Sequence, residues 1–191
     1  MEVSLFVSLQ GENIMAKYRP IPKKLIASAA LIALLGTAAP MVLDDVARHE
    51  GYVPEAYKDP IGIWTKCFGD TYDVTPGETY TFEQCLESLN TQVYRHAAPV
   101  LKCVPGLADQ HDKVKTAMIS MAYNIGTGGF CKSSVARKAN SGDWEGACKR
   151  MAEIYRTAGG VPLRGLEIRR EAESKLCLEG VKEGYDVRVS R

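Results

Sequence analysis

Two acidic side chains and one hydroxyl follow each other at short intervals near residue 50 of this 191-residue chain. Asp59 comes nine residues after Glu50, and Thr65 comes six residues after Asp59. Hydrolysis of a glycosidic bond needs a carboxylic acid that protonates the leaving oxygen. It also needs a carboxylate that activates water or attacks from the other side of the sugar. Glu50 and Asp59 have the chemistry for these two roles.

The elements predicted around the two carboxyl groups give them different surroundings. Residues 44–50 have the pattern of a short helix that Gly51 ends, which places Glu50 at a helix C-terminus. The partial negative charge of a helix C-terminus disfavours a carboxylate, so this position suits a proton donor. Asp59 begins the sequence Asp-Pro-Ile-Gly, which is typical of an exposed type I turn. Either residue alone is a common structural feature, and only their joint spacing indicates catalysis.

A small antiparallel sheet is expected to carry Asp59 and Thr65. Aromatic and β-branched residues flank the turn between positions 52 and 64, which predicts a hairpin. The strand pattern continues through residues 65–68. A stretch rich in Gly, Asp, Thr and Pro, residues 69–79, closes the sheet.

Helices are predicted for the rest of the chain. Thr81 and Gln84 form a capping box at the start of one helix, which Pro99 should end or bend. A central core helix has Val114, Ala117, Met118, Met121 and Ile125 on one face. Further helices are expected at 133–138, 143–155 and 167–178, with a loop around residues 159–162 and a frayed tail after residue 180.

The segment Leu25–Leu43 contains nineteen residues without a charge, which is long enough to cross a bilayer as a helix. Basic residues precede it and two aspartates follow it, so the positive-inside rule places the N-terminus in the cytoplasm and the following domain outside. Three interpretations compete: a cleaved signal peptide, an uncleaved signal anchor and a buried core helix. We favour the uncleaved anchor. Residues 1–14 are interpreted as an upstream extension of a reading frame that begins at Met15.

Six cysteines, all located after this segment, agree with export to an oxidising compartment. Disulfides are favoured over free thiols, and the absence of a Cys-x-x-Cys motif argues against zinc. Six cysteines allow 15 connectivities. We expect the pairs that would join neighbouring elements, and they are Cys67 with Cys85, Cys103 with Cys131, and Cys148 with Cys177. We expect no metal and no cofactor, and the net charge of +1 gives no indication of nucleic-acid binding.

Several separated motifs resemble the endolysins of glycoside hydrolase family 24, the phage-type lysozymes. The similarity begins with His49-Glu50-Gly51, Tyr57-Lys58-Asp59 and Gly62-Ile63-Trp64-Thr65. It continues in order through residues 121–126, 129–130, 158–160 and 165–171, and so covers roughly residues 44 to 179. The ordered series is more specific than any one of these motifs.

The resemblance implies cleavage between N-acetylmuramic acid and N-acetylglucosamine of peptidoglycan. Glu50 would be the acid, Asp59 would position the water, and Thr65 would help to hold it. A single inverting displacement requires the two carboxyl groups to stand roughly 6.5 to 9.5 Å apart. Arg170 matches an arginine that supports the catalytic glutamate by a charged hydrogen bond. Asp70 departs from the pattern, because many relatives have a histidine there.

The hydrophobic segment resembles the signal-anchor-release segment of certain endolysins, which remain inactive in the inner membrane until it is depolarised. Tethering would hold Glu50 within about seven residues of the bilayer. The expected partners are therefore peptidoglycan and the host inner membrane, which residues 25–43 contact before release. The localisation expected is the inner membrane facing the periplasm, then the periplasm.

The sequence as a whole predicts an α+β, lysozyme-like fold with a small antiparallel sheet lobe and a larger helical lobe. The divisions expected are a basic N-terminal tail (1–24), the anchor (25–43), the catalytic domain (44–180) and a C-terminal tail (181–191). The enzyme is expected to be a monomer. A membrane-tethered, non-catalytic peptidoglycan-binding protein is the main alternative, and a structural envelope protein is a third, which leaves the spacing of Glu50, Asp59 and Thr65 unexplained.

Overall fold

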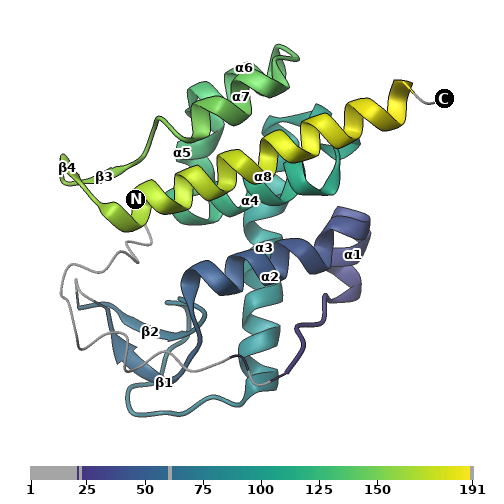
Figure 1. Ribbon diagram of the computed structural model, residues 1–191. Helices are drawn as coiled ribbons and strands as arrows, with labels where there is room; N and C mark the ends of the chain where they lie inside the picture. The colour runs from purple at the N-terminus through teal and green to yellow at the C-terminus, as the bar shows by residue number, and fades with distance from the viewer. Residues whose placement is uncertain (1–20, 22, 60–61, 190–191) are drawn as a thin grey trace.

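The computed structural model describes residue 21, residues 23–59 and residues 62–189, with side chains as far as residue 184. The interpretation of residues 1–14 and Met15 lies outside the described residues. A two-stranded antiparallel sheet and its loops form a small lobe, and helices form the larger one (Figure 1). This arrangement confirms the predicted α+β, lysozyme-like fold.

The described helices share one hydrophobic core, into which nearly every helix contributes buried side chains. In chain order they are α1 (Ala29–Leu35), the 3-10 helix η2 (Gly36–Ala38), α2 (Ala39–Glu50), α3 (Phe82–Cys103), the 3-10 helix η3 (Pro105–Asp109), α4 (Asp112–Ile125), α5 (Thr127–Lys132), α6 (Ser134–Asn140), α7 (Trp144–Met151) and α8 (Arg164–Val189).

The small lobe is the predicted hairpin. Strand β1 (Val53–Lys58) pairs antiparallel with β2 (Trp64–Cys67), and an irregularity in register separates the pair at Val53 from the pair at Tyr57. Isolated bridges join residues 55 and 79 and residues 66 and 70, so the loop after β2 folds back on the hairpin as expected. Thr65 and Cys67 are both buried because alternate residues of a strand face the same side.

The hydrophobic N-terminal segment is packed against the helical lobe. Its large side chains recur at helical spacing along α1 and α2, and Leu31, Leu35, Val42 and Leu43 are buried. Residues 29–50 are also long and apolar enough to cross a membrane. The predicted boundary at residue 44 falls inside α2, because the helix that ends at Glu50 begins at residue 39. In this conformation one side of the segment packs into the core, while Ile26 and Ile32 are exposed.

Helix α3 begins with the predicted capping box, in which Thr81 accepts from the Gln84 amide and Gln84 accepts from the Thr81 amide. Pro99 does not end the helix, which continues through Cys103. A proline in a helix interior removes one backbone hydrogen bond and often ends or kinks the helix, but α3 runs one further turn past Pro99. Helix α4 is the central helix expected from the methionine pattern, and Val114, Ala117 and Met118 are buried on it.

The C-terminal helices differ from the prediction mainly in length. Residues 157–158 (β3) and 161–162 (β4) form a short antiparallel pair where a loop was expected. Helix α8 continues to residue 189, so the predicted frayed tail after Gly180 is wrong. A Cβ at Gly180 would lie 2.8 Å from Lys113, so the glycine permits close packing on α4 and does not end the helix. Lys113 also binds Glu179 and Glu183.

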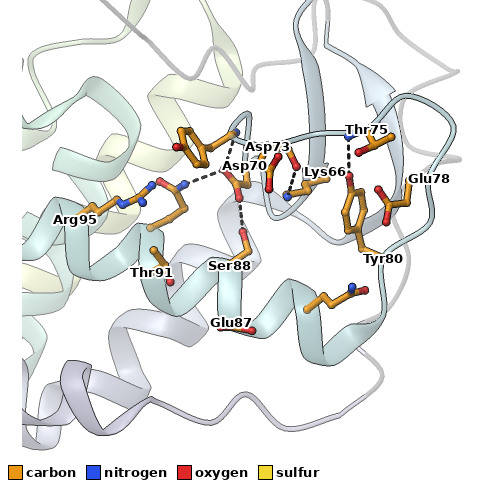
Figure 2. Close-up of a pocket in the computed structure, with 13 residues that line it drawn as sticks. Lys66, Asp70, Asp73, Thr75, Glu78, Tyr80, Glu87, Ser88, Thr91 and Arg95 are labelled. Atoms are coloured by element: carbon orange, nitrogen blue, oxygen red, sulfur yellow. Dashed lines mark hydrogen bonds between the residues drawn. The ribbon is translucent and has the colours of Figure 1, made fainter.

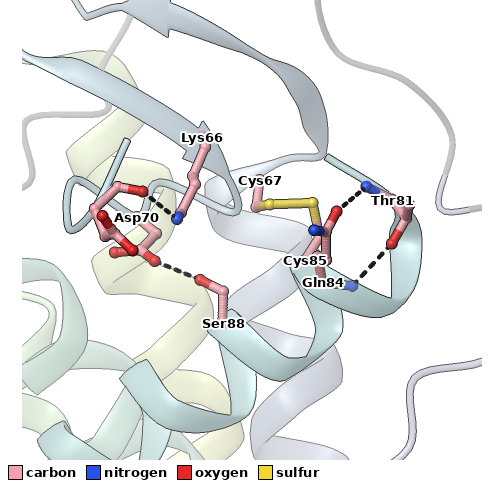
Figure 3. Close-up of a disulfide and its surroundings, with 8 residues drawn as sticks. Lys66, Cys67, Asp70, Thr81, Gln84, Cys85 and Ser88 are labelled. Carbon is pink, nitrogen blue, oxygen red and sulfur yellow. Dashed lines mark hydrogen bonds between the residues drawn. A yellow bond between two sulfur atoms is a disulfide. The ribbon is translucent and has the colours of Figure 1, made fainter. Parts of the chain in front are cut away.

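The three disulfides are the pairs expected from the sequence. Cys67 is bonded to Cys85, Cys103 to Cys131 and Cys148 to Cys177. The first joins β2 to α3 beside the capping box (Figure 3). The second joins α3 to α5, and the third joins α7 to α8. Each disulfide therefore connects two elements that are neighbours in the fold.

Candidate active site

Glu50 is the last residue of α2, and its side chain is buried. Gly51 follows with a φ of 75°, and its amide donates to the carbonyl of Ala47. A positive φ is easy for glycine, so the chain turns sharply here and enters the hairpin. The short distance in sequence from Glu50 to β1 places the carboxyl group where the helical lobe meets the sheet.

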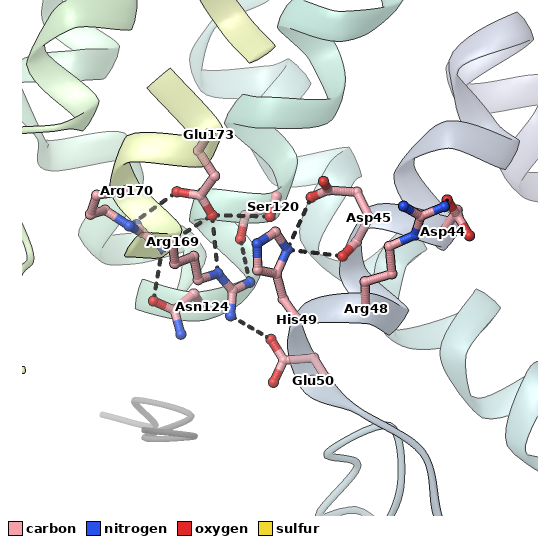
Figure 4. A network of polar contacts seen from close by, with 10 residues as sticks. All are labelled: Asp44, Asp45, Arg48, His49, Glu50, Ser120, Asn124, Arg169, Arg170 and Glu173. Atoms are coloured by element: carbon pink, nitrogen blue, oxygen red, sulfur yellow. Dashed lines mark hydrogen bonds and ion pairs between the residues drawn. The ribbon is translucent and has the colours of Figure 1, made fainter. Parts of the chain in front are cut away.

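One carboxyl oxygen of Glu50 is held by an arginine from the last helix. Arg169 Nη1 donates a 2.8 Å hydrogen bond to Glu50 Oε1, and both side chains are buried (Figure 4). The same guanidinium donates to the carbonyl of Ser120 on α4. Arg169 therefore fixes the carboxyl group of Glu50 from α8, at the point where α2 ends.

The expected partner of Glu50 was Arg170, and the structure corrects this by one position. Arg170 donates from Nη2 to Asn124 and to Glu173, and it is fully buried. Consecutive residues on a helix point about 100° apart, so only one of two adjacent arginines can reach α2. Arg170 is therefore connected to Glu50 only through Glu173 and Arg169.

The other carboxyl oxygen, Glu50 Oε2, is buried and accepts no hydrogen bond from the residues that the structure describes. Gly69 lies beside it with a φ of 84°, and a Cβ at that position would be 3.5 Å from Oε2. A side chain at position 69 would therefore cover the oxygen. The glycine therefore lets the chain turn out of β2 without placing a side chain against Glu50 Oε2.

Two titratable rings also lie near Glu50, and both are neutral around pH 7. Burial raises the pKa of Tyr123 well above its ordinary value, and the negative charge of Glu50 adds to this effect. Burial lowers the pKa of His96, and the charge of Glu50 only partly opposes this. The two rings are packed with their centroids 4.6 Å apart. The wall around Glu50 is thus uncharged on the α3 and α4 sides.

Asp59 and Thr65 are brought together by the backbone of Ile63. The Ile63 amide donates to Asp59 Oδ1 at 2.8 Å, and the Ile63 carbonyl accepts from the Asp59 amide at 2.9 Å. The Thr65 hydroxyl donates to the same carbonyl at 3.1 Å. Because this hydroxyl donates its hydrogen to Ile63, its oxygen can accept a hydrogen bond from another donor such as water. The Gly62 amide also donates a hydrogen bond to the Asp59 carbonyl at 2.9 Å.

Both carboxylate oxygens of Asp70 accept hydrogen bonds, although many relatives were expected to have a histidine at this position. Its carboxylate accepts from the Ser88 hydroxyl at 2.5 Å, from Gln92 Nε2 at 2.8 Å and from the Tyr72 amide at 2.9 Å. A cavity of about 400 Å³ lies between this loop and α3 (Figure 2). Glu50, Asp59 and Thr65 do not line it. The cavity is therefore distinct from the candidate catalytic residues.

The functional neighbours that the sequence analysis missed are on α8 and in the loop after β2. Arg169 and Glu173 share the helix face of Leu166 and Cys177, which follow the spacing of an apolar stripe. That phase predicts that both charged residues are buried, but Arg170 is buried as well, so the stripe does not decide which arginine reaches Glu50. Gly69 and the carbonyl of Ile63 act through backbone geometry, for which the sequence gives only a weak signal.

The chain is similar to a known protein family and to several named proteins. The family described as phage lysozyme matches residues 47–173. The SAR-endolysin of Enterobacteria phage P21 is 38% identical over 141 residues, which cover 72% of this chain and 81% of the relative. The SAR-endolysin of Escherichia phage P1 is 31% identical over 150 residues, covering 73% of this chain and 80% of that protein.

Solved structures show the same architecture. The active form of the P1 phage endolysin Lyz superimposes with a TM-score of 0.68 at 27% identity, covering 86% of this chain and 97% of that one. A mutant of P22 lysozyme gives a TM-score of 0.64 at 29% identity, covering 72% of this chain and 95% of that one. The coverage of the P1 structure extends beyond the residues that match the family sequence.

Proposed function

The chain belongs to the phage lysozyme family, and on that premise we propose that it is an endolysin that hydrolyses the β-1,4 bond between N-acetylmuramic acid and N-acetylglucosamine in peptidoglycan. The observation that supports this best is the state of Glu50. One of its oxygens is fixed by Arg169, and the other has no hydrogen-bond donor among the described residues. A carboxyl group that is fixed at one oxygen keeps its other oxygen for proton transfer to a leaving oxygen.

Asp59 and Thr65 are proposed to hold the attacking water. The water would donate one hydrogen to the Asp59 carboxylate, which takes the proton as the oxygen attacks the sugar carbon. Its second hydrogen would be accepted by the Thr65 hydroxyl oxygen, since that hydroxyl already donates to the Ile63 carbonyl. Glu50 would donate its proton to the departing sugar oxygen in the same step. This balance describes a single displacement with inversion at the anomeric carbon.

The N-terminal segment is proposed to have two successive environments. Residues 25–43 would first cross the host inner membrane as an uncleaved anchor and then leave it, so that the released protein lies in the periplasm. The same residues make the core of the folded domain, where Leu31 and Val42 are buried. A single segment cannot fill both places at once. Anchoring would therefore leave α2, and with it Glu50, without its packing partners.

The test is lysis by the purified protein, with Glu50→Gln as the decisive variant. Gram-negative cells with a permeabilised outer membrane should clear in turbidity with the wild type and not with Glu50→Gln. Glu171→Gln, an exposed position on α8, is the matched control and should clear the cells. Digested peptidoglycan should carry new reducing ends on N-acetylmuramic acid, initially as the inverted anomer by NMR. Binding to peptidoglycan without clearing, by both wild type and variant, would establish the non-catalytic alternative.

A further inference from the structure

Glu173 on α8 is the buried centre of a charged cluster behind Glu50. Its Oε1 accepts hydrogen bonds from Arg169 Nε at 3.1 Å, from Arg170 Nη2 at 3.1 Å and from the Ser120 hydroxyl at 3.0 Å. Its Oε2 lies 3.0 Å from Arg170 Nε as an ion pair. The side chain is 1% exposed. Glu173 therefore contacts both arginines at once (Figure 4).

The pKa values of the two arginines are shifted in opposite directions. Burial would lower the pKa of Arg169, but the carboxylates of Glu50 and Glu173 outweigh it and raise that pKa. Burial lowers the pKa of Arg170 to about 10, although Glu173 opposes the change. Arg169 is thus bound on two sides, by Glu173 at Nε and by Glu50 at Nη1. Two positive groups face two acidic groups in a space closed to water.

The charge on Glu173 decides how strongly Arg169 attracts the proton donor's carboxylate. With Glu173 ionised, one acidic group already balances part of the arginine charge, and Glu50 can be neutral without leaving a large excess. Without that charge, two arginines would face Glu50 alone and would stabilise its carboxylate. A glutamate that has lost its proton cannot serve as the acid.

We propose that Glu173 is a positioning residue for the reaction: it fixes the guanidinium of Arg169 and takes up arginine charge, so that Arg169 orients Glu50 without stripping its proton. This inference rests on the proposed role of Glu50 as the acid. Glu173 itself acts only through Arg169 and does not touch the substrate.

The other groups around Glu50 do not neutralise the charges of both arginines. His96 from α3 and Tyr123 from α4 face it in their neutral forms. Asp45 lies on α2 near Arg169, and its carboxylate is 3.4 Å from His49 Nδ1. Within the described part of the chain, Glu173 is the carboxylate that forms ion pairs with both Arg169 and Arg170.

A purely structural role for Glu173 makes a different prediction. In that role Glu173 would only stabilise the fold by neutralising the buried arginines. Loss of the Glu173 charge would then reduce the free energy of unfolding without changing the proton affinity of Glu50. Activity would then fall by the same factor at every pH. The position of the alkaline limb of the pH profile separates the two roles, because this limb reports the loss of the proton from the catalytic acid.

The experiment measures kcat/KM against pH on soluble peptidoglycan glycan strands. Glu173→Gln keeps the shape of the side chain and removes its charge, and its alkaline limb should move to lower pH by roughly one unit. Glu171→Gln, two residues away and exposed, should keep the wild-type limb. Equal loss at every pH, with the limb in its wild-type position, would overturn the proposal.

A second variant with the opposite sign keeps the test decisive if Glu173→Gln does not fold. Arg170→Gln removes one positive charge and leaves Glu173 in place, so the alkaline limb should move to higher pH. A limb that stays in place or moves down in Arg170→Gln overturns the proposal. Failure of the catalytic assignment is recognised separately, because Glu50→Gln would then remain active. An inactive Glu50→Gln together with unmoved limbs in the other variants rejects the role of Glu173 alone.

Discussion

Arg169 reaches from the last helix to Glu50, a residue 119 positions earlier, and the two side chains meet at 2.8 Å out of contact with solvent. The bond joins the end of α2 to α8 across the core. A buried pair of this kind costs a great deal when one member is removed, because the other charge is left without a partner.

Replacing Arg169 by methionine should therefore destabilise the protein by about 3 to 5 kcal/mol. Methionine fills much of the same volume but donates nothing to Glu50 or to the Ser120 carbonyl. The measurement is urea unfolding followed by circular dichroism. Arg164→Met on the same helix is the control, since that side chain is largely exposed, and it should change the free energy of unfolding by less than about 0.5 kcal/mol. Equal effects in the two variants would contradict the buried pair.

Gly69 and Gly77 form a matched pair for testing access to Glu50. Their φ values are 84° and 82°, so alanine at either position should cost about 1 to 2 kcal/mol of backbone strain. Only at Gly69 would the new Cβ face Glu50 Oε2, at 3.5 Å, whereas nothing lies within 4 Å at Gly77. Gly69→Ala should therefore reduce lytic activity beyond its effect on stability. Activity lost equally in Gly77→Ala would show that strain alone is responsible.

Two disulfides of nearly equal loop length should differ in what their removal costs. The Cys148–Cys177 and Cys103–Cys131 separations are 29 and 28 residues, so the chain-entropy contribution of each is about 3 to 4 kcal/mol. Cys148 and Cys177 are fully buried, whereas the other pair is only partly buried. The double alanine variant at 148 and 177 should lose more stability, because it also leaves a cavity. Equal losses in the two double variants would exclude a contribution from burial.

Stability in acid should depend on Asp45. Burial raises its pKa, but the hydrogen bond and charge of His49, together with the nearby Ser120 and Arg169, outweigh this and lower it below its ordinary value. A lowered pKa in the folded state stabilises the protein above the unfolded value, near 3.9, and this stabilisation is lost as the pH falls through the folded value. Asp45→Asn should therefore show a flatter fall in unfolding free energy below about pH 4. A fall as steep as in the wild type would contradict this.

Asn90 holds the N-terminal segment against α3. Its Oδ1 accepts from the Ser28 amide at 2.7 Å, and its Nδ2 donates to the Ile26 carbonyl at 3.1 Å. Asn90→Ala should remove both hydrogen bonds to the segment, at a cost of about 1 to 3 kcal/mol. Amide hydrogen exchange at residues 26–35 should accelerate, with Thr91→Ala as an exposed control on the same helix. Protection equal to the wild type would show that packing alone holds the segment.

How much of the fold could be predicted depended on whether the signal was local. The capping box at Thr81 and the apolar face of α4 are short-range patterns, and both were recognised. The choice between Arg169 and Arg170 required the phase of α8 relative to α2, a long-range property. The hydrophobic segment is ambiguous for a physical reason, because an apolar helix satisfies a bilayer and a protein core alike. Only the packing of Leu31 and Val42 against other helices distinguishes them.

The disulfides have a consequence for the order of assembly. All three lie between residues 67 and 177, and none involves α1 or α2. All three disulfides can therefore form before α1 and α2 have packed into the core. Disulfide formation and the packing of α1 and α2 are therefore separate steps, the first covalent and the second reversible. The chain after residue 67 can be fully cross-linked before α1 and α2 join the core.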